Sequence, residues 1–284
     1  MNAPSQKLCM IIGDPIAHSL SPLIHTTGYR ALRIDSQYSY TALRVTPEEL
    51  ADFMNEVRET GIRGISCTSP HKITIMAYLD EIDGVARKIG AVNSVVNNDG
   101  ELIGYNTDWL GVVQPLEKLA PLSGKHVAMF GAGGAARAIA YGITNRGGKL
   151  TIYNRTLDKA KVLADELGAT AASLSPDELA AIKSMDIIIN ASSVGMRPDD
   201  AATPVPRQYI TNKHIVFDAV YVPYETRLLR EAAEQGAQVI HGTEMLLQQG
   251  VAQFKLYTGY DAPVDAMRKA LNEALAPKAS GVKP

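Results

Sequence analysis

The sequence contains few cysteines, little net charge and no long apolar run. Its two cysteines, Cys9 and Cys67, follow no secretory leader, so we expect free thiols in a reducing, cytoplasmic compartment rather than a disulfide framework. The net charge of −2 combines mixed signs and provides no field for nucleic acid or for an acidic membrane surface. No apolar stretch is long enough to span a bilayer. These absences leave small molecules as the expected partners.

Two further absences narrow the class of protein. The histidines His18, His25 and His71 form no i, i+4 pair and no Cys/His set with ligand spacing, so metal catalysis is not expected. No internal repeat or heptad array is present. With 284 residues, of which 46% are hydrophobic, the chain is long enough for one large or two ordinary domains. Only the tail at residues 277–284, which is small and polar and contains Pro and Gly, is predicted to be disordered.

A glycine-rich stretch follows an apolar run at residues 127–130 and precedes a helix-like run at 135–145. Gly131, Gly133 and Ala136 fit G-x-G-x-x-[G/A] in the strand-to-helix context in which this pattern binds a dinucleotide. Free backbone N–H groups at the helix start would hold the pyrophosphate. They belong to Gly131, Ala132, Gly133, Gly134 and Ala135. Alone this signal is weak, because glycine there could simply form a tight turn between strand and helix.

The next strand, predicted at residues 150–154, indicates which dinucleotide is bound. An NAD site usually has Asp or Glu near the end of this strand to accept the ribose 2′-OH. Here the chain reads Asn154-Arg155-Thr156, with Lys159 one turn later. A guanidinium pairs with a 2′-phosphate that a carboxylate would repel, so we expect NADP(H) rather than NAD(H). Alternatively, Thr156 only caps the following helix and Arg155 is a solvated charge.

The N-terminal part alternates strands and helices before any dinucleotide motif appears. The predicted elements are strands at 8–12, 38–43 and 64–68 and helices at 22–32 and from the capping box Thr46-Pro47-Glu48-Glu49 onward. This alternation is typical of a doubly wound α/β sheet. Pro22 suits the first helical position, with Ser21 as the cap. Together with Ser19, Ser21 could also form an anion site for a substrate carboxylate at the helix start.

Lys72 and Asp108 are the candidate catalytic residues. Lys72 follows the third strand at its carboxyl end, where open α/β sheets bind ligands. It is also predicted to open a helix, although a cation is poorly placed at the positive end of a helix dipole. Asp108 opens another helix and could be only a favourable first-turn carboxylate, just as Lys72 could be only a solvated charge. If the fold brings them together, they form a proton-transfer pair.

Asn93 lies inside an apolar strand predicted at residues 91–96. A buried amide must find hydrogen-bond partners, so Asn93 is either a structural bridge or a ligand contact. The loop at 190–196 is made largely of small residues, as expected where a flat cofactor ring lies over the backbone. Gln249 lies on a helix predicted at 242–257, where it could be plain helix surface or reach a substrate hydroxyl.

Together the elements predict two doubly wound α/β domains, of which the second is a Rossmann-type NADP-binding domain. Residues 1–108 would form a substrate-binding catalytic domain, and residues 109–242 the dinucleotide-binding domain. Helices at 242–257 and 262–276 fall outside the βα rhythm, so we expect residues 243–276 to pack back on the first domain and complete it. By analogy, the cleft between the domains is expected to close on its ligands.

Six motifs, taken in order along the chain, resemble those of the shikimate dehydrogenase family from about Ile12 to Gly259. They lie at residues 13–22, 64–72, 89–94, 104–108, 218–223 and 242–250. This series is far more specific than the glycine loop alone. The resemblance implies reversible NADP-dependent oxidation of shikimate to 3-dehydroshikimate, and hence a place in aromatic amino acid biosynthesis through the chorismate pathway.

The resemblance also implies roles for single residues. Lys72 would be the acid/base, and Asp108 would orient the substrate hydroxyl and the ammonium. Ser19 and Ser21 would hold the substrate carboxylate. Ring hydroxyls would be contacted by Thr68, Asn93, Asp108, Tyr221 and Gln249. The nicotinamide half of the cofactor would lie along Ser192, Ala219 and Gly242.

Three departures from the family pattern leave alternatives open. The chain has Ser66-Cys67 where Asn-Val is usual, Ser94 where Thr is usual, and Thr26 where Asn is usual. A paralogue acting on a related cyclic polyol acid such as quinate remains open, since an extra hydroxyl would need a polar partner near Ser21 or Thr68. A non-catalytic NADP(H)-binding sensor and a purely structural or partner-binding protein are the alternatives outside enzymes. A homodimer is also left open.

Overall fold

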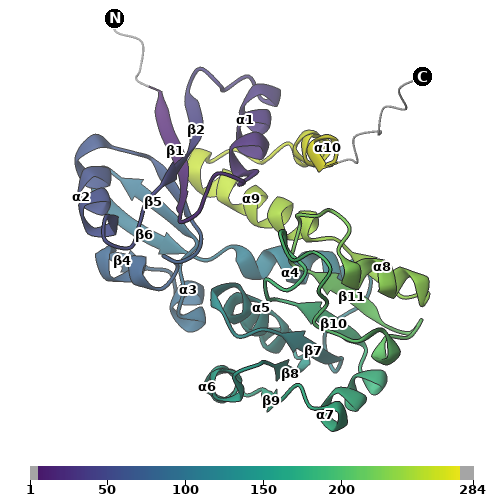
Figure 1. Ribbon diagram of the computed structural model, residues 1–284. Coiled ribbons are helices and arrows are strands. Elements are labelled where there is room, and N and C mark those ends of the chain that lie inside the picture. Colours follow the sequence, from purple (N-terminus) through teal and green to yellow (C-terminus); the bar gives the residue numbers. More distant parts are fainter. Residues whose placement is uncertain (1–5, 276–284) are drawn as a thin grey trace, which may run out of the picture.

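The computed structural model describes residues 6–275 and contains two six-stranded sheets with helices packed on them (Figure 1). The tail predicted at residues 277–284 lies outside the described residues. Within residues 6–275, no helix is both long and apolar enough to cross a lipid bilayer. The two sheets and their helices confirm the predicted α/β class.

The first sheet has the order β2-β1-β3-β5-β6-β4 and combines parallel and antiparallel pairs. Its strands are β1 (Lys7–Gly13), β2 (Tyr38–Arg44), β3 (Gly64–Cys67), β4 (Glu81–Ile82), β5 (Ser94–Asn98) and β6 (Glu101–Tyr105). β1 is parallel to β2 and β3, as a doubly wound sheet requires. β5, however, is antiparallel to both β3 and β6. The first sheet is therefore mixed, which differs from the sequence-based prediction.

A tight hairpin turn produces this antiparallel part. Asp99 and Gly100 connect β5 with β6, and their φ angles are +53° and +98°. An Asp-Gly pair with positive φ at both positions is a favoured two-residue hairpin connection, because its twist matches the twist of the strands. The Gly100 N–H also donates to Asn97 Oδ1 at 2.8 Å. The Asp-Gly dipeptide between two apolar runs is a hairpin signal that the prediction of a single strand at residues 91–96 overlooked.

Two helical starts in the first half differ from the prediction. The helices there are α1 (Ser21–Ala31), α2 (Leu50–Thr60), the 3-10 helix η1 (Thr74–Tyr78) and α3 (Gly84–Ile89). α2 begins only at Leu50, although the Thr46 N–H donates to Glu49 Oε2 at 2.8 Å, which is one half of the predicted capping box. Lys72 does not open a helix, because it lies in a turn ahead of η1. The unfavourable position at a helix N-terminus is thereby avoided.

The second sheet is parallel throughout and has the order β12-β11-β10-β7-β8-β9. Its strands are β7 (His126–Phe130), β8 (Lys149–Tyr153), β9 (Thr170–Ala172), β10 (Ile187–Asn190), β11 (Ile215–Asp218) and β12 (Gln238–Ile240). Numbered from β7, this is the order 3-2-1-4-5-6 of Rossmann folds, which bind dinucleotides where the strand order reverses. The crevice expected for a dinucleotide therefore lies at the carboxyl ends of β7 and β10.

Helices cover both faces of the second sheet, so its strands are buried on both sides. These helices are α5 (Gly134–Asn145), α6 (Leu157–Leu167), α7 (Pro176–Ala180), the 3-10 helices η2 (Ala181–Ser184) and η3 (Arg207–Tyr209), and α8 (Arg227–Glu234). Val127 and Met129 of β7 belong to one core, whereas Ala128 and Phe130 belong to the other. Burial on both faces explains why the strand reads as a continuous apolar run.

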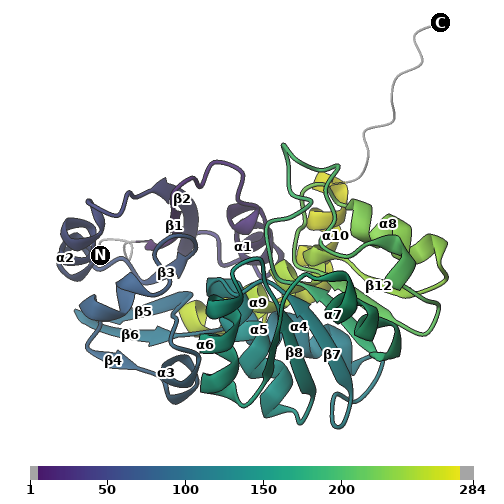
Figure 2. The same ribbon diagram turned by 60° about the horizontal axis from the view of Figure 1, so that its bottom comes forward.

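Two helices connect the halves of the molecule, namely α4 (Asp108–Glu117) and α9 (Gly242–Thr258). Figure 2 shows them between the first sheet and the second. Met245 of α9 belongs to the core of the second sheet, whereas Leu247 and Phe254 pack with residues of β1 and α1. The last helix, α10 (Val264–Leu275), adds Met267 to the core around β1 and α1. The C-terminal helices therefore return to the first half, as predicted.

Candidate functional site

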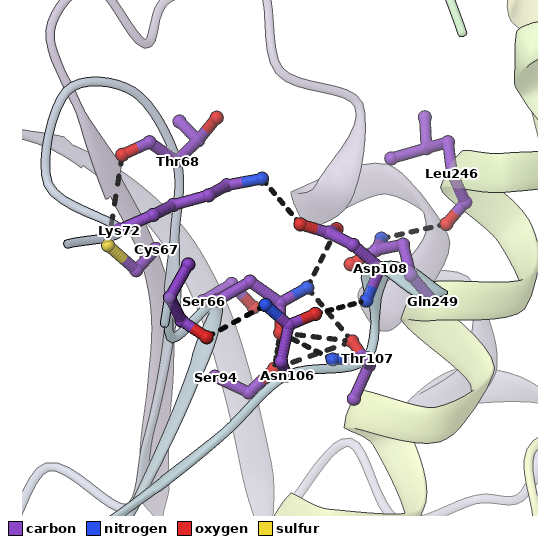
Figure 3. A network of polar contacts seen from close by, with 12 residues as sticks. Ser66, Cys67, Thr68, Lys72, Ser94, Asn106, Thr107, Asp108, Leu246 and Gln249 are labelled. Atoms are coloured by element: carbon purple, nitrogen blue, oxygen red, sulfur yellow. Dashed lines mark hydrogen bonds and ion pairs between the residues drawn. The ribbon is translucent and has the colours of Figure 1, made fainter. Parts of the chain in front are cut away.

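Lys72 and Asp108 form an ion pair. Lys72 Nζ lies 2.6 Å from Asp108 Oδ2. Figure 3 shows Lys72 reaching from the turn after β3 toward Asp108, which begins α4. The two side chains are 15% and 6% exposed, so water screens their interaction little. The structure thus brings the two candidate catalytic residues together.

Asn93 supports the other oxygen of this carboxylate. Its Nδ2 donates to Asp108 Oδ1 at 2.8 Å and to Thr107 Oγ1 at 3.0 Å. Its Oδ1 accepts from the Thr107 N–H at 2.7 Å and from Ser94 Oγ at 2.8 Å. Asn93 is 2% exposed and lies just before β5. Asn93 therefore bridges Ser94, Thr107 and Asp108, with its amide placed directly against the Asp108 carboxylate.

The residue before Thr107 also shapes this site and was not singled out from the sequence. The Asp108 N–H donates to Asn106 Oδ1 at 3.0 Å, and Asn106 Nδ2 donates to the Ala91 carbonyl at 2.9 Å. These bonds hold the start of α4 against the loop that carries Asn93. The signal was present, because Asn and Thr directly before a helix commonly bond to its first backbone groups.

Ser19 and Ser21 lie at the N-terminus of α1. Ser19 Oγ accepts from the Ser21 N–H at 3.3 Å. The prediction that Ser21 caps the helix is wrong, because Leu20 occupies the N-cap position and Ser21 is already helical. Thr68 follows β3, and a Cβ on Gly13 would lie 2.5 Å from its methyl carbon. The loops after β1 and β3 therefore touch, which brings Thr68 to the segment that carries the serines.

Two residues from the second half of the chain contribute to the same region. Gln249 is 8% exposed, and its Nε2 donates to the carbonyl of Leu246 on its own helix at 2.8 Å. Figure 3 shows its side chain beside Asp108. Tyr221 follows β11 and packs partly buried on the core that contains Leu246 and Leu247, and this burial raises the pKa of its phenol.

The glycine loop leaves its backbone open at the start of α5. Gly131 has a φ of +117°, and a Cβ there would lie 3.0 Å from the Ala191 carbonyl oxygen, so glycine is required. Gly133 occupies the N-cap position, and a Cβ on it would meet no atom within 4 Å. The side chain of Lys72 passes 3.7 Å from the Cβ position of Gly134. The lysine of the first half therefore lies against the dinucleotide loop of the second half.

Two exposed cations follow the end of β8. Within residues 6–275, the side chains of Arg155 and Lys159 are exposed and form no ion pair or hydrogen bond. Thr156 holds the N-cap position of α6, where the alternative interpretation placed it, but its side chain makes no cap hydrogen bond. Asn154 Nδ2 instead donates to the Thr156 carbonyl at 2.8 Å. Beside them lies an open cavity of about 330 Å³ lined by Ala132, Arg137, Asp158, Lys159, Val162 and Leu163.

The loops after β10 and β11 are tied together by Asn190 and Asp218, which sequence reasoning missed. Asp218 accepts from Thr226 Oγ1 at 2.6 Å and from Asn190 Nδ2 at 2.9 Å. Burial raises the pKa of Asp218 to about 6, while hydrogen bonds from Thr226, from the Val220 backbone and from Asn190 oppose this rise. An amide or carboxylate at the end of an apolar strand is the signal that could have found them.

The three residues expected along the nicotinamide lie on these loops. Ser192 Oγ donates to Asn190 Oδ1 at 2.6 Å, so the hydroxyl helps to fold its own loop. The Ala219 N–H donates to the Asn190 carbonyl at 2.9 Å. A Cβ on Gly242 would lie 2.4 Å from the Val220 carbonyl oxygen, so glycine allows α9 to begin directly against this loop.

The second sheet is parallel and in Rossmann order, exposed cations follow β8, and a lysine–carboxylate pair lies against the glycine loop. This combination is typical of a dinucleotide-dependent oxidoreductase. Three family descriptions match successive parts of the chain. They are the Shikimate dehydrogenase substrate binding domain at residues 11–95, Shikimate / quinate 5-dehydrogenase at 115–197 and the Shikimate 5'-dehydrogenase C-terminal domain at 242–271.

Whole-chain similarities agree with these matches. A shikimate dehydrogenase (NADP(+)) of Nitrosopumilus maritimus is 42% identical over 271 residues, which are 93% of this chain and 98% of the relative. A shikimate 5-dehydrogenase of Thermus thermophilus, solved in complex with NADP(H) and shikimate, has a TM-score of 0.88 at 35% identity and covers 95% of this chain and 100% of its own. A quinate dehydrogenase of Corynebacterium glutamicum, solved in complex with NAD, has a TM-score of 0.85 at 28% identity. The match covers 94% of this chain and 99% of the quinate dehydrogenase chain. The chain therefore belongs to the family of NADP-dependent shikimate dehydrogenases.

Proposed function

We propose that the protein catalyses the reversible oxidation of shikimate to 3-dehydroshikimate, with Lys72 as the acid/base and Asp108 as its partner. The observation that carries this proposal is the position of Lys72. Its ammonium is 2.6 Å from the Asp108 carboxylate, while its aliphatic stem lies against Gly134 of the dinucleotide loop. A proton-transfer group is thus available where a substrate carbon would face the cofactor.

The residues present fit NADP(H). The backbone around Gly133 is open at the start of α5, as a pyrophosphate site requires. Arg155 and Lys159 are exposed cations near the cavity between the glycine loop and α6, which suits a 2′-phosphate. When bound there, NADP(H) supplies the hydride acceptor or donor for the reaction. Ser192, Ala219 and Gly242 would hold its nicotinamide half.

In the oxidation, neutral Lys72 would accept the proton of the reacting hydroxyl as the carbon loses its hydride. In the reduction, the Lys72 ammonium would return a proton to the carbonyl oxygen as the carbon gains the hydride, so charge and atoms balance in both directions. Asp108 holds the lysine in place through Oδ2 while Asn93 holds its Oδ1. Because both side chains are largely buried, the pair is preorganised and little solvent must be displaced.

The substrate would lie between the loops of the first half and α9. Ser19, Ser21 and the N-terminus of α1 would hold its carboxylate, since free N–H groups and hydroxyls suit an anion. Ring hydroxyls would bond to Thr68, Asn93, Asp108, Tyr221 and Gln249. We assign this task to residues 1–108 with 243–276, and cofactor binding to residues 109–242. A cytoplasmic location and a homodimer stay predictions.

A quinate dehydrogenase activity is the second candidate, because a quinate dehydrogenase matches the whole fold. Quinate carries one more ring hydroxyl, which would need a free polar partner near Ser21 or Thr68. Ser66 and Ser94, which depart from the family pattern, are 1% and 0% exposed and are already hydrogen-bonded inside the protein. They do not supply that partner, so shikimate is the favoured substrate.

A substrate panel tests these proposals. Purified protein is mixed with shikimate or quinate and with NADP+ or NAD+, and NADPH or NADH formation is followed by absorbance. We expect turnover with shikimate and NADP+, with kcat/KM for quinate at least ~10-fold lower, because a missing hydrogen bond in a polar site costs at least this factor. If the protein bound a cofactor but turned over no substrate, the sensor alternative would be supported. If it neither bound a cofactor nor turned over a substrate, the structural alternative would be supported.

A further inference from the structure

Gln253 lies in the protein interior and uses its amide in three hydrogen bonds. It belongs to α9, one turn after Gln249, and is 1% exposed. Its Oε1 accepts from Ser66 Oγ at 2.8 Å. Its Nε2 donates to Ser94 Oγ at 3.0 Å and to the Asn93 carbonyl at 3.2 Å. The helix is thereby joined to Ser66 of β3, to Ser94 of β5 and to Asn93, whose amide bonds Asp108.

The Asn93 carbonyl sets the orientation of the Gln253 amide, because a carbonyl can only accept and Nε2 must face it, which leaves Oε1 to face Ser66. The Tyr40 OH donates to Ser66 Oγ at 2.6 Å, and the Tyr257 OH lies 3.0 Å from the same oxygen. A serine has a single proton, so Ser66 accepts from the tyrosines and gives its own proton to Gln253 Oε1. Because Oε1 faces Ser66, the NH2 group of Gln253 faces Ser94.

The same reasoning continues from Ser94 to Asp108. Ser94 Oγ accepts from Gln253, which leaves the Ser94 proton for Asn93 Oδ1 at 2.8 Å. With its oxygen held there, Asn93 turns its NH2 group toward Asp108 Oδ1. A reversed Asn93 amide would put its oxygen against the carboxylate, and two acceptors facing each other in a buried site are unfavourable.

We propose that Gln253 is a positioning residue, which acts through Ser94 to orient the Asn93 amide that holds Asp108 in place for Lys72. This inference rests on the proposed function. No proton passes along the series, because amide groups keep their donor and acceptor ends. Gln253 joins Ser66 and Ser94, two of the positions at which the sequence departs from the family pattern, so these departures form one hydrogen-bonded unit.

The test compares Q253M, S94A and the double variant with the wild type in shikimate oxidation by NADP+. Q253M keeps the size of the side chain but removes all three bonds, and S94A removes the next link. Because the Thr107 N–H still bonds Asn93 Oδ1, each should lower kcat by only about 10-fold. KM for shikimate should change by less than about threefold, and Kd for NADP+ by less than about twofold, since neither residue contacts the cofactor. The double variant should also lose only about 10-fold, because both substitutions break the same link.

Two further variants keep the test decisive. S94T retains the hydroxyl and should keep kcat within about threefold of the wild type even if Q253M does not fold. Q248M makes the same substitution at the neighbouring buried position of α9 and should leave kcat within about twofold. The inference is overturned by normal kcat in both Q253M and S94A, by additive losses of about 100-fold in the double variant, or by an equal loss in Q248M. Absence of turnover in the wild type would instead contradict the proposed function.

Discussion

Replacing Asp108 by Asn tests how the carboxylate serves Lys72. Its two oxygens accept from two donors, Lys72 Nζ at 2.6 Å and Asn93 Nδ2 at 2.8 Å. An Asn side chain has one oxygen and one NH2 group, so in either orientation its NH2 group faces the donor of Lys72 or of Asn93. If the oxygen of the new Asn side chain accepts from Asn93, the Lys72 ammonium loses its partner, although the Lys72 side chain is only 15% exposed.

The magnitude follows from that burial. Leaving one member of a buried ion pair without its partner costs about 3–5 kcal/mol, and the partial exposure of Lys72 favours the lower end. About 3 kcal/mol corresponds to a loss of roughly 10²-fold in rate. The assay is the initial rate of NADPH formation at saturating shikimate and NADP+, which gives kcat directly.

A control separates this effect from a general loss of stability. Asp80 is half exposed and pairs with Arg58 near the same sheet, so Asp80→Asn should leave kcat within about twofold. If Asp108→Asn folded normally and kept kcat within about threefold of the wild type, the carboxylate would not be needed to hold Lys72 and this reasoning would be refuted.

Two other predictions concern the second half of the molecule. Arg155→Asp should raise Kd for NADP+ by about 10- to 100-fold and change Kd for NAD+ by less than about threefold, because it removes a partner of the 2′-phosphate and adds repulsion. The matched control is Lys161→Asp, which alters an exposed lysine paired with Asp158 on the same helix. If Arg155→Asp weakened the binding of NADP+ and NAD+ equally, Arg155 would be excluded as the ligand of the 2′-phosphate. Burial raises the pKa of Asp218 from 3.8 to about 6, so this carboxyl group binds its proton more tightly in the folded state. Stability should therefore fall as pH rises from about 4 to about 6. Chemical denaturation should show the free energy of unfolding of the wild type, relative to Asp218→Asn, decreasing by up to about 3 kcal/mol over this window, and a difference that does not change with pH would contradict the burial argument.

The second sheet could be predicted from the sequence because its signals are local. Five of the six strands contain a short apolar run, and the glycine loop lies directly between β7 and α5, whereas β9 (Thr170–Ala172) was not among the predicted strands. Parallel strands buried on both faces need no alternation, so the apolar runs and the turns between them were sufficient. In the first half the Asp99-Gly100 hairpin was overlooked, and β6 and its antiparallel pairing with β5 were missed with it.

The candidate site could be predicted only in part, because its contacts join distant parts of the chain. Lys72 and Asp108 were singled out by residue type and by their places at element ends, and their 2.6 Å separation depends on how α4 meets the turn after β3. No local pattern joins Gln253 to Ser66, which lies 187 positions earlier. The role of Ser21 as a cap was misjudged because a favoured residue type at a helix start need not occupy the N-cap position. Thr156 does occupy the N-cap position but makes no side-chain cap bond.

The central claim is that Lys72 moves the proton of the reacting hydroxyl. The most direct measurement is the steady-state oxidation of shikimate by NADP+ for the wild type and for Lys72→Ala. The account predicts that kcat falls by at least ~10²-fold while KM changes little, since an acid/base group acts mainly in the transition state. A folded Lys72→Ala protein with a turnover close to that of the wild type would contradict it.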